Sequence, residues 1–516
     1  MSNDTDSPSN KPGRLTLKSR SATPEKTDKA DKAGKPAKPN SIKTGARAHQ
    51  KKRALTERAR TEPVTPAKPA FEGRRAPTTS GAGPQRDANQ RGNKPRTNEA
   101  SRPGSDRNAR PARADVKRKP VFAPASSATN APSTEERFHL FASCPRGLEQ
   151  ALCNELNKLG FVGVQAAQAG CRFEGHWSDV WRANLHSRLA TRILMQLAHA
   201  KVANEDELRQ LALGVPWERW LGPQKTLRVD TSAIRSPMQS LQYCNLLVKD
   251  SVCDRLRDKE GARPSIDTVR PDVRVHSFLG QDSATLYLDT SGESLFKRGW
   301  RLDKAQAPIR ENLAAGLLAL SGWQPNVALL DPFCGSGTIL IEAAWIALNI
   351  PPGINRPFAF ERLRVHEPHS WQEIRRAATE SIGNELNAPI IGCDLSAQAI
   401  EAAKRNMQRA GLKPDTIEWR VDDARTTLPN SSAGMIVTNP PYGERLEVES
   451  DLMQAWATNL KQHFAGWQVN VISADHTLPG AMRLKPKRRV PLFNGALDCR
   501  LFMFEMVSAQ YDPKNA

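Results

Sequence analysis

Hydrophobic and polar positions follow different patterns on the two sides of about residue 300. Before it, strand-like alternation is mixed with helical spacing. Residues 137–161 predict a strand, a turn and an amphipathic helix, with Leu148, Leu152 and Leu156 on one helix face and Gly160 at its end. We expect further helices at 177–189, 205–213 and 240–260, strands within 163–175 and at 226–233, and a hairpin around 280–282. The pattern predicts an α+β module with mixed strand pairing.

From about residue 306, buried strands alternate with helices. A helix is expected over 307–322. The expected strands are 327–331, 389–394, 416–421, 434–437 and 467–474. Asn494-Gly495 predicts the turn of a closing hairpin, which adds an antiparallel edge. Because strands and helices alternate, this region predicts an α/β fold with a doubly wound, mostly parallel sheet.

The first 130 residues show neither pattern. They hold 30 Lys and Arg against 12 Asp and Glu, a net charge of +18, and their aromatic residues are Phe71 and Phe122. Such a segment buries too little apolar area to offset its ordering entropy, so we expect residues 1–135 to form a disordered basic tail. It is either a solvated tail or an arm that contacts nucleic acid phosphates. We prefer the arm because of its charge.

The eight cysteines are scattered without CxxC spacing, so the sequence suggests neither a zinc site nor a disulfide framework and fits a reducing cytosol. The first ten residues lack the regions of a signal peptide. No apolar run approaches the ~18 residues that span a bilayer. We therefore expect a cytoplasmic protein with no metal and no membrane contact.

Several expected strands end in segments that can carry chemistry, and such sheets bind ligands beyond the carboxyl ends of their strands. The first strand is followed by "DPFCGSGT", residues 331–338. Gly335 and Gly337 permit close backbone approach, and the next helix offers its N–H groups to an anion. Taken alone, a plain tight turn is an equally good interpretation. The segment is not a P-loop, because no Gly-Lys-Ser/Thr follows.

The next two strands end in acidic residues. Asp394 is suited to bind ribose hydroxyls. Its alternative role is a helix N-cap, which Ser396 fills better. Asp423 can accept a hydrogen bond from an adenine amino group, and a turn aspartate is nearly as good an interpretation.

The fourth strand is followed by Asn439-Pro440-Pro441-Tyr442. The prolines end the strand and stiffen the turn. The side-chain oxygen of Asn439 and the carbonyl of Pro440 can accept the two N–H bonds of an exocyclic amine, which frees its lone pair for attack. Tyr442 can stack on a flipped base. This chemistry depends on positioning and electrostatics and needs no His or Cys nucleophile.

In this order, the four strand ends resemble S-adenosylmethionine-dependent methyltransferases that modify exocyclic amino groups. The segments "LFASCPRGLEQ", "LDTSGESLFKRGWR", "APIRENLAA", "SGWQP" and "NPPYGERL" are similar to the THUMP-domain guanine-N2 methyltransferases of 23S ribosomal RNA, the RlmL-like group. The resemblance covers roughly residues 137–508.

The resemblance implies a ferredoxin-like part and a THUMP RNA-binding domain, about 178–290, within residues 136–300. A seven-stranded class I methyltransferase domain would occupy residues 305–510. It implies S-adenosylmethionine as cofactor, 23S rRNA as partner and methylation of a guanine N2 as the reaction. The implied cofactor-binding residues are Asp331, Gly335, Gly337, Thr338, Asp394 and Asp423. The implied catalytic residues are Asn439, Pro440, Pro441 and Tyr442.

Some relatives carry a second methyltransferase domain after the first, whereas this chain ends just past its closing hairpin, so we expect a single one. Three alternatives stay open: the same chemistry on guanine in tRNA or on adenine N6, on a protein glutamine amide, or a non-catalytic RNA-binding assembly factor. An intact glycine loop and Asn439 speak against the last.

Three further sets of residues carry weaker expectations. Arg298 and Arg301 are candidates for RNA phosphate contacts, with a solvated linker as the alternative. The basic stretch 485–489 favours RNA contact slightly. The tryptophans are expected in the core rather than on a base-stacking surface: Trp177, Trp181, Trp217 and Trp220.

Overall fold

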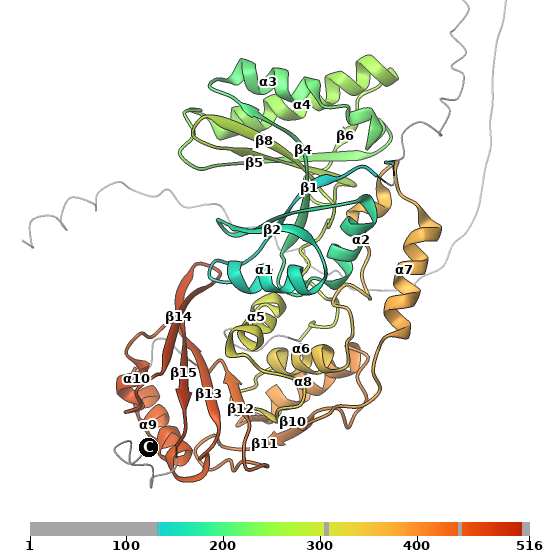
Figure 1. The fold of residues 1–516 in the computed structure, drawn as a ribbon. Helices are drawn as coiled ribbons and strands as arrows, with labels where there is room; N and C mark the ends of the chain where they lie inside the picture. The colour runs from blue at the N-terminus through green and yellow to red at the C-terminus, as the bar shows by residue number, and fades with distance from the viewer. Residues whose placement is uncertain (1–131, 134, 304–308, 442–445, 508–516) are drawn as a thin grey trace, which may run out of the picture. The chain divides into compact units, whose positions relative to one another are not determined.

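The computed structural model describes residues 132–133, 135–303, 309–441 and 446–507, which form two β-sheets and the helices packed on them (Figure 1). The tail expected over residues 1–135 lies almost entirely outside the described residues. Tyr442 lies outside them as well.

The N-terminal sheet contains eight strands in the described part of the chain, in the order β2-β3-β1-β4-β8-β7-β5-β6. Its strands are β1 (Phe138–Ser143), β2 (Val162–Ala167), β3 (Gly170–Gly175), β4 (Arg192–Lys201), β5 (Thr226–Ala233), β6 (Ser265–Ile266), β7 (Val273–Leu279) and β8 (Ser283–Asp289). Its helices are α1 (Glu149–Lys158), α2 (Trp177–His186), α3 (Glu205–Gly214) and α4 (Leu241–Glu260), with a 3-10 turn at Trp217–Arg219. Strand β5 pairs in parallel with β6 and β7, whereas β4 pairs antiparallel with β1 and β8. The expected mixed pairing is confirmed.

Strand β4 occupies the middle of this sheet, between β1 and β8, but the sequence patterns do not predict it. Its first half buries Ile193, Leu194 and Met195 in succession, so no alternation is visible there. The pairing register then shifts between Gln196 and Ala198, which moves the second half out of phase with the first. A bulged strand with a continuous apolar run lacks the period of two by which strands are recognised.

The C-terminal sheet has seven strands in the described residues, in the order β11-β10-β9-β12-β13-β15-β14. They are β9 (Leu329–Asp331), β10 (Ile390–Asp394), β11 (Glu418–Val421), β12 (Met435–Thr438), β13 (Gln468–Ser473), β14 (Arg488–Asn494) and β15 (Leu497–Glu505). The helices of this region are α5 (Glu311–Ser321), α6 (Thr338–Ala347), α7 (Pro368–Glu380), α8 (Ala397–Arg409), α9 (Leu446–His463) and α10 (Leu478–Ala481), with a 3-10 turn at Ala359–Arg362.

The expected doubly wound sheet with an antiparallel hairpin is confirmed. Strands β9 to β13 pair in parallel, and β15 runs antiparallel to both of its neighbours. The second strand of the hairpin therefore inserts beside β13 and leaves β14 at the edge of the sheet.

Arg298 lies inside the molecule, and both interpretations of it from the sequence, RNA contact and solvated linker, are wrong. Its side chain is 1% exposed and its Nε lies 3.2 Å from Glu342 Oε1 in α6. The guanidinium also donates to the carbonyls of Leu295 and Arg188, at 2.7 and 2.6 Å. Arg301 is also largely buried and pairs with Glu311 of α5. These arginines join the N-terminal region to the helices of the C-terminal sheet.

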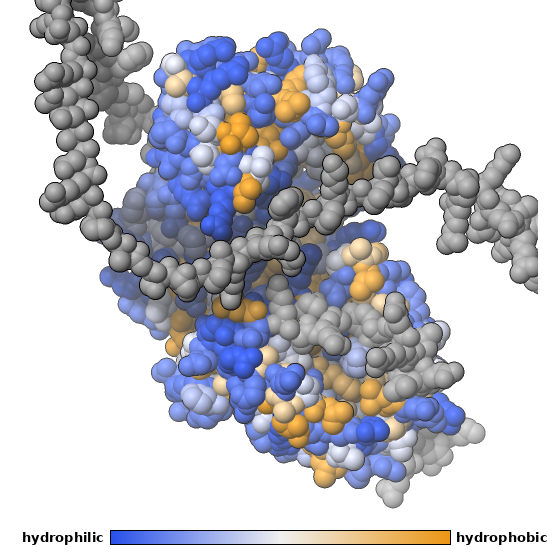
Figure 2. All heavy atoms as spheres, turned by 180° about the vertical axis from the view of Figure 1, so that it is seen from behind, coloured by the Kyte–Doolittle hydropathy of each residue, from blue (hydrophilic) through white to orange (hydrophobic). Residues whose placement is uncertain are grey.

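The four tryptophans assigned to the core are all buried, which confirms that expectation. The basic stretch is mostly exposed, and its two arginines, Arg488 and Arg489, belong to the edge strand β14. The molecular surface is mostly hydrophilic in the view of Figure 2, with apolar side chains in smaller patches. Among the helices described, none is both long and apolar enough to cross a membrane.

Candidate functional site

A cavity of about 580 Å³ opens where the carboxyl ends of β9, β10 and β12 meet. Six of the residues singled out from the sequence line it: Gly335, Asp394, Asp423, Asn439, Pro440 and Pro441. They come from loops as far as 106 positions apart in the chain. The parallel order β10-β9-β12 brings them together, because it places the ends of these strands side by side.

Asp331 ends β9 but lies beneath the cavity, with 2% of the residue exposed. Its carboxylate accepts a hydrogen bond from the Thr438 hydroxyl at 2.6 Å and from the Phe333 N–H at 3.1 Å. Burial raises the pKa of Asp331 to about 7, against the lowering effect of these hydrogen bonds. Thr438 directly precedes Asn439, so Asp331 anchors the strand end that carries the candidate catalytic turn.

Asp394 ties the second strand end to the glycine loop. Its Oδ2 accepts from the Gly335 N–H at 2.9 Å, and its Oδ1 accepts from the Ser396 N–H at 2.9 Å. Ser396 caps α8, with its hydroxyl accepting from the Ala399 N–H, as its position in the sequence suggested. Asp394 also borders the cavity, and its carboxylate oxygens can each accept a further hydrogen bond there.

Gly337 and Thr338 form the start of α6 behind the cavity wall rather than on it. Gly337 has a φ of 79°, and a Cβ there would lie 2.6 Å from the Trp419 ring and 3.1 Å from Ala403. Glycine is therefore required at this position by the packing of α6 against β11 and α8 as well as by the turn.

Asp423 borders the cavity beyond β11, and its carboxylate is already engaged by Arg425. The Arg425 N–H donates to it at 2.9 Å and the guanidinium forms an ion pair with it. The hydrogen bond from Arg425 lowers the pKa of Asp423, although partial burial opposes the shift. Arg425 also borders the cavity and brings a positive charge to it that the sequence motifs did not reveal.

The turn after β12 presents Asn439, Pro440 and Pro441 to the cavity. Asn439 is half-buried, Pro440 is buried and Pro441 is exposed. The strand beneath is fully buried, and its Ile436 carbonyl accepts from the buried Asn470 amide at 3.1 Å. The proline-stiffened turn thus rests on a rigid support, which suits it to hold acceptor oxygens in place.

Apolar side chains complete the cavity, and the sequence analysis did not single them out. Leu395, whose surface is 72% exposed, follows Asp394 directly, and Phe333 lies within the glycine loop. Phe333 is held edge-on by Trp456 of α9, with ring centroids 5.1 Å apart. An acidic group beside apolar walls and a helix start fits a nucleoside-bearing cofactor: a carboxylate for ribose hydroxyls, and apolar surface for the base.

Three family models match the chain. They describe an RlmL ferredoxin-like domain over residues 139–194, a THUMP domain over 202–289 and an RMKL-like methyltransferase domain over 298–502. A curated relative from Syntrophotalea carbinolica, named ribosomal RNA large subunit methyltransferase K/L, is 38% identical over 385 residues. The alignment covers 72% of this chain and 54% of that protein. The chain thus spans about half the length of this curated relative.

Two solved structures are similar to this chain over more than two thirds of its length. The crystal structure of SMU.472 complexed with SAH is 28% identical, with a TM-score of 0.67 over 73% of this chain and 100% of that one. A structure named a predicted N6-adenine-specific DNA methylase, from Listeria monocytogenes str. 4b F2365, is 31% identical, with a TM-score of 0.66 over 72% of this chain and 97% of that one.

Proposed function

The chain belongs to the family of RMKL-like methyltransferases that also carry an RlmL ferredoxin-like domain and a THUMP domain, and we propose on this basis that it methylates the exocyclic N2 amino group of a guanine in 23S ribosomal RNA. Its cofactor is S-adenosylmethionine, in keeping with the SAH-bound relative. The observation that carries the proposal is the single cavity lined by Gly335, Asp394, Asp423 and the Asn439-Pro440-Pro441 turn.

The cofactor, when bound, supplies an electrophilic methyl group on a sulfonium. In this chain, the Asp394 carboxylate is placed to accept hydrogen bonds from ribose hydroxyls, next to the apolar side chain of Leu395. Asp423 and the neighbouring backbone can meet the adenine edge. Gly335 borders the cavity, so the backbone of the glycine loop can come close to the amino acid part of the cofactor there.

The substrate amine is activated by position rather than by a strong base. The lone pair of an exocyclic nitrogen is delocalised into the base, so the nitrogen is a weak nucleophile. The Asn439 side-chain oxygen and the Pro440 carbonyl can accept its two N–H bonds and favour a pyramidal nitrogen. Held in this way, the nitrogen would take the methyl group that a bound cofactor supplies, leave the cofactor's sulfur as a neutral thioether, and release one proton to solvent. The buried Asp331–Thr438 hydrogen bond acts as a positioning contact, since it holds the end of β12.

The second candidate is methylation of adenine N6, which the printed name of the Listeria relative favours. The same two acceptors serve either amine, so the catalytic turn does not separate the two substrates. The ferredoxin-like and THUMP matches favour RNA over DNA. Nucleoside mass spectrometry of rRNA and tRNA from a deletion strain separates the candidates, because N2-methylguanosine lost from 23S rRNA supports one and N6-methyladenosine lost supports the other.

Replacing Asn439 tests the mechanism directly. Asn439→Ala should lower methyl transfer to rRNA by 100-fold or more, on the order of the loss seen when one oxyanion-type contact is removed, while cofactor binding changes little. Asn387→Ala, an exposed asparagine in the loop before β10, is the matched control and should leave turnover unchanged. Unchanged turnover in Asn439→Ala would contradict the assigned mechanism.

A further inference from the structure

The N-terminal sheet has one face that is sealed and one that is partly open. Residues that pair across neighbouring strands point to the same side of the sheet. One such row crosses β3, β1, β4, β8 and β7, and all its residues are buried: Phe173, Leu140, Met195, Leu288 and Val275. The helices α1 to α4 supply the apolar side chains that cover this face. The alternate residues must therefore face the other side.

That other face carries aromatic rings beside polar groups. Phe141 of β1 and Tyr287 of β8 lie on it with ring centroids 6.2 Å apart, on the two sides of the central strand β4. A cavity of about 330 Å³ is lined by both rings and by the amides of Gln165 and Gln196. His139 borders the same cavity with 70% of its side chain exposed. Rings flanked by amides and imidazoles provide stacking surface and hydrogen-bonding groups in one place.

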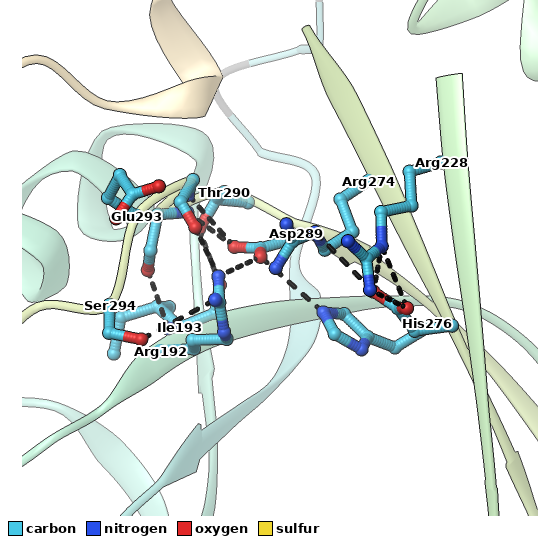
Figure 3. Close-up of polar contacts among 12 residues, drawn as sticks. Arg192, Ile193, Arg228, Arg274, His276, Asp289, Thr290, Glu293 and Ser294 are labelled. Carbon is cyan, nitrogen blue, oxygen red and sulfur yellow. Dashed lines mark hydrogen bonds and ion pairs between the residues drawn. The ribbon is translucent and has the colours of Figure 1, made fainter. Parts of the chain in front are cut away.

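Two acidic groups toward the β5 side of this face are already paired with basic ones, and Figure 3 shows the pairing around Asp289. Asp289 is buried and forms ion pairs with Arg192 and His276. Asp230 is paired in the same way by Arg228 and Arg274. Three arginines thus stand against two carboxylates, so this half of the face carries a net positive charge whatever the charge of His276.

Next to the aromatic pair, the basic side chain is not neutralised. Arg172 of β3 is exposed and stands opposite Phe141 in the strand register. It forms no ion pair with any residue that the structure describes. Burial raises the pKa of the Tyr287 hydroxyl, and the positive charge of Arg172 is close enough to act in the opposite direction. The nearby carboxylate of Glu174 pairs with His139 rather than with Arg172, with Glu174 Oε1 lying 3.4 Å from His139 Nδ1.

We propose that this open face, centred on Phe141, Tyr287 and Arg172, binds a single-stranded stretch of the RNA substrate, with bases stacked on the two rings and a phosphate on Arg172. The proposal rests on the proposed function for RNA as partner. Aromatic side chains on an open sheet face stack unpaired bases in other RNA-binding sheets, and arginine contacts their phosphates. An RNA duplex keeps its bases inside the helix and cannot use these rings.

The positive charge of the open face favours RNA over the other candidate ligands. The basic N-terminal tail of this chain, with its net charge of +18, is repelled by Arg172 and by the arginines beyond it. A polyanion with exposed bases satisfies both the charge and the rings. A second copy of the chain is the remaining alternative, and the experiment below distinguishes it.

Binding of labelled single-stranded RNA to the full chain, measured by fluorescence anisotropy at fixed salt, tests the proposal. Phe141→Ala and Tyr287→Ala should each weaken binding by about tenfold, whereas Tyr287→Phe, which keeps the ring, should bind like the unaltered protein. Arg172→Ala should reduce the slope of log K against log salt by about 0.7, the value for one lost phosphate contact on a single strand. Arg209→Ala, an exposed arginine on α3 of the covered side, is the matched control and should leave the slope unchanged.

Thermal denaturation of each variant must match the unaltered protein, so that lost binding reflects the face rather than the fold. Equal affinities for all variants would overturn the proposal, and so would a concentration-dependent dimer that Phe141→Ala abolishes while RNA binding persists. Methyl transfer to rRNA by the unaltered chain is measured in parallel. Transfer with unaffected variant binding refutes the open face alone, whereas variant-sensitive RNA binding without any transfer refutes the proposed function alone.

Discussion

The buried ion pair between Arg298 and Glu342 makes a strong prediction about stability. Arg298→Met removes the positive charge and keeps most of the side-chain volume. It leaves the Glu342 carboxylate, whose side chain is 0% exposed, without its cation, and it leaves the carbonyls of Leu295 and Arg188 without their donors. Removing one partner of a buried ion pair typically costs about 3–5 kcal/mol. The lost donors fall within that figure, because all three contacts share one guanidinium.

Thermal unfolding followed by circular dichroism measures the effect. For domains of this size about 1 kcal/mol shifts the Tm by roughly 2–4 °C, so Arg298→Met should lower the Tm by roughly 6–20 °C. The double variant Arg298→Met with Glu342→Leu should recover most of that loss, because a buried ion pair and a packed apolar pair are often of similar stability. A Tm for Arg298→Met within about 1 °C of the unaltered protein would refute the reasoning, and so would a double variant that is no more stable than the single one.

Two further changes test the cofactor loop. Gly337→Ala should destabilise the protein by about 1–2 kcal/mol or more, because the added Cβ is strained at a positive φ and clashes with Trp419. Gly322→Ala is the control: its φ is 72° and no atom lies near its Cβ, so it should show the cost of the backbone strain alone. The midpoints of denaturant unfolding measure the stability of the two variants. Asp331→Asn should remove a pH dependence of stability. The pKa of Asp331 is about 7 in the folded protein against 3.8 for the free side chain, so its ionisation destabilises the fold progressively as the pH rises from about 4 to 7, by up to about 4 kcal/mol. The variant should therefore have a higher Tm than the unaltered protein at pH 8 but not at pH 4. A Tm difference that is the same at both pH values would contradict the burial of this carboxyl.

The regular elements of the C-terminal region could be predicted because their signals are local. Each buried strand and the glycine loop, acidic residue or proline turn that follows it lie within about ten residues of sequence. The parallel order follows from alternating strands and helices. Together they predicted that Gly335, Asp394, Asp423 and Asn439 meet at one edge of the sheet, and the structure brings these four to a single cavity.

Other features depend on contacts between residues far apart in the chain. The sequence suggested that Arg298 lies on the surface, because its partner, Glu342, stands 44 positions later in a helix whose other residues are mostly apolar. Strand β4 escaped prediction because its bulge breaks the alternation, and its neighbours β1 and β8 are distant in sequence.

The sequence by itself determined most of the helices and strands, the family and the residues able to take part in the reaction, because these depend on residue type and on short spacings along the chain. The tertiary structure alone decided which side of a strand faces solvent, and therefore that Phe141, Tyr287 and Arg172 share an open surface. It also decided that Asp331 lies beneath the cavity rather than on it. The physical reason is that burial and ion pairing depend on the neighbours that folding supplies, and a period along the chain shows only that two faces exist.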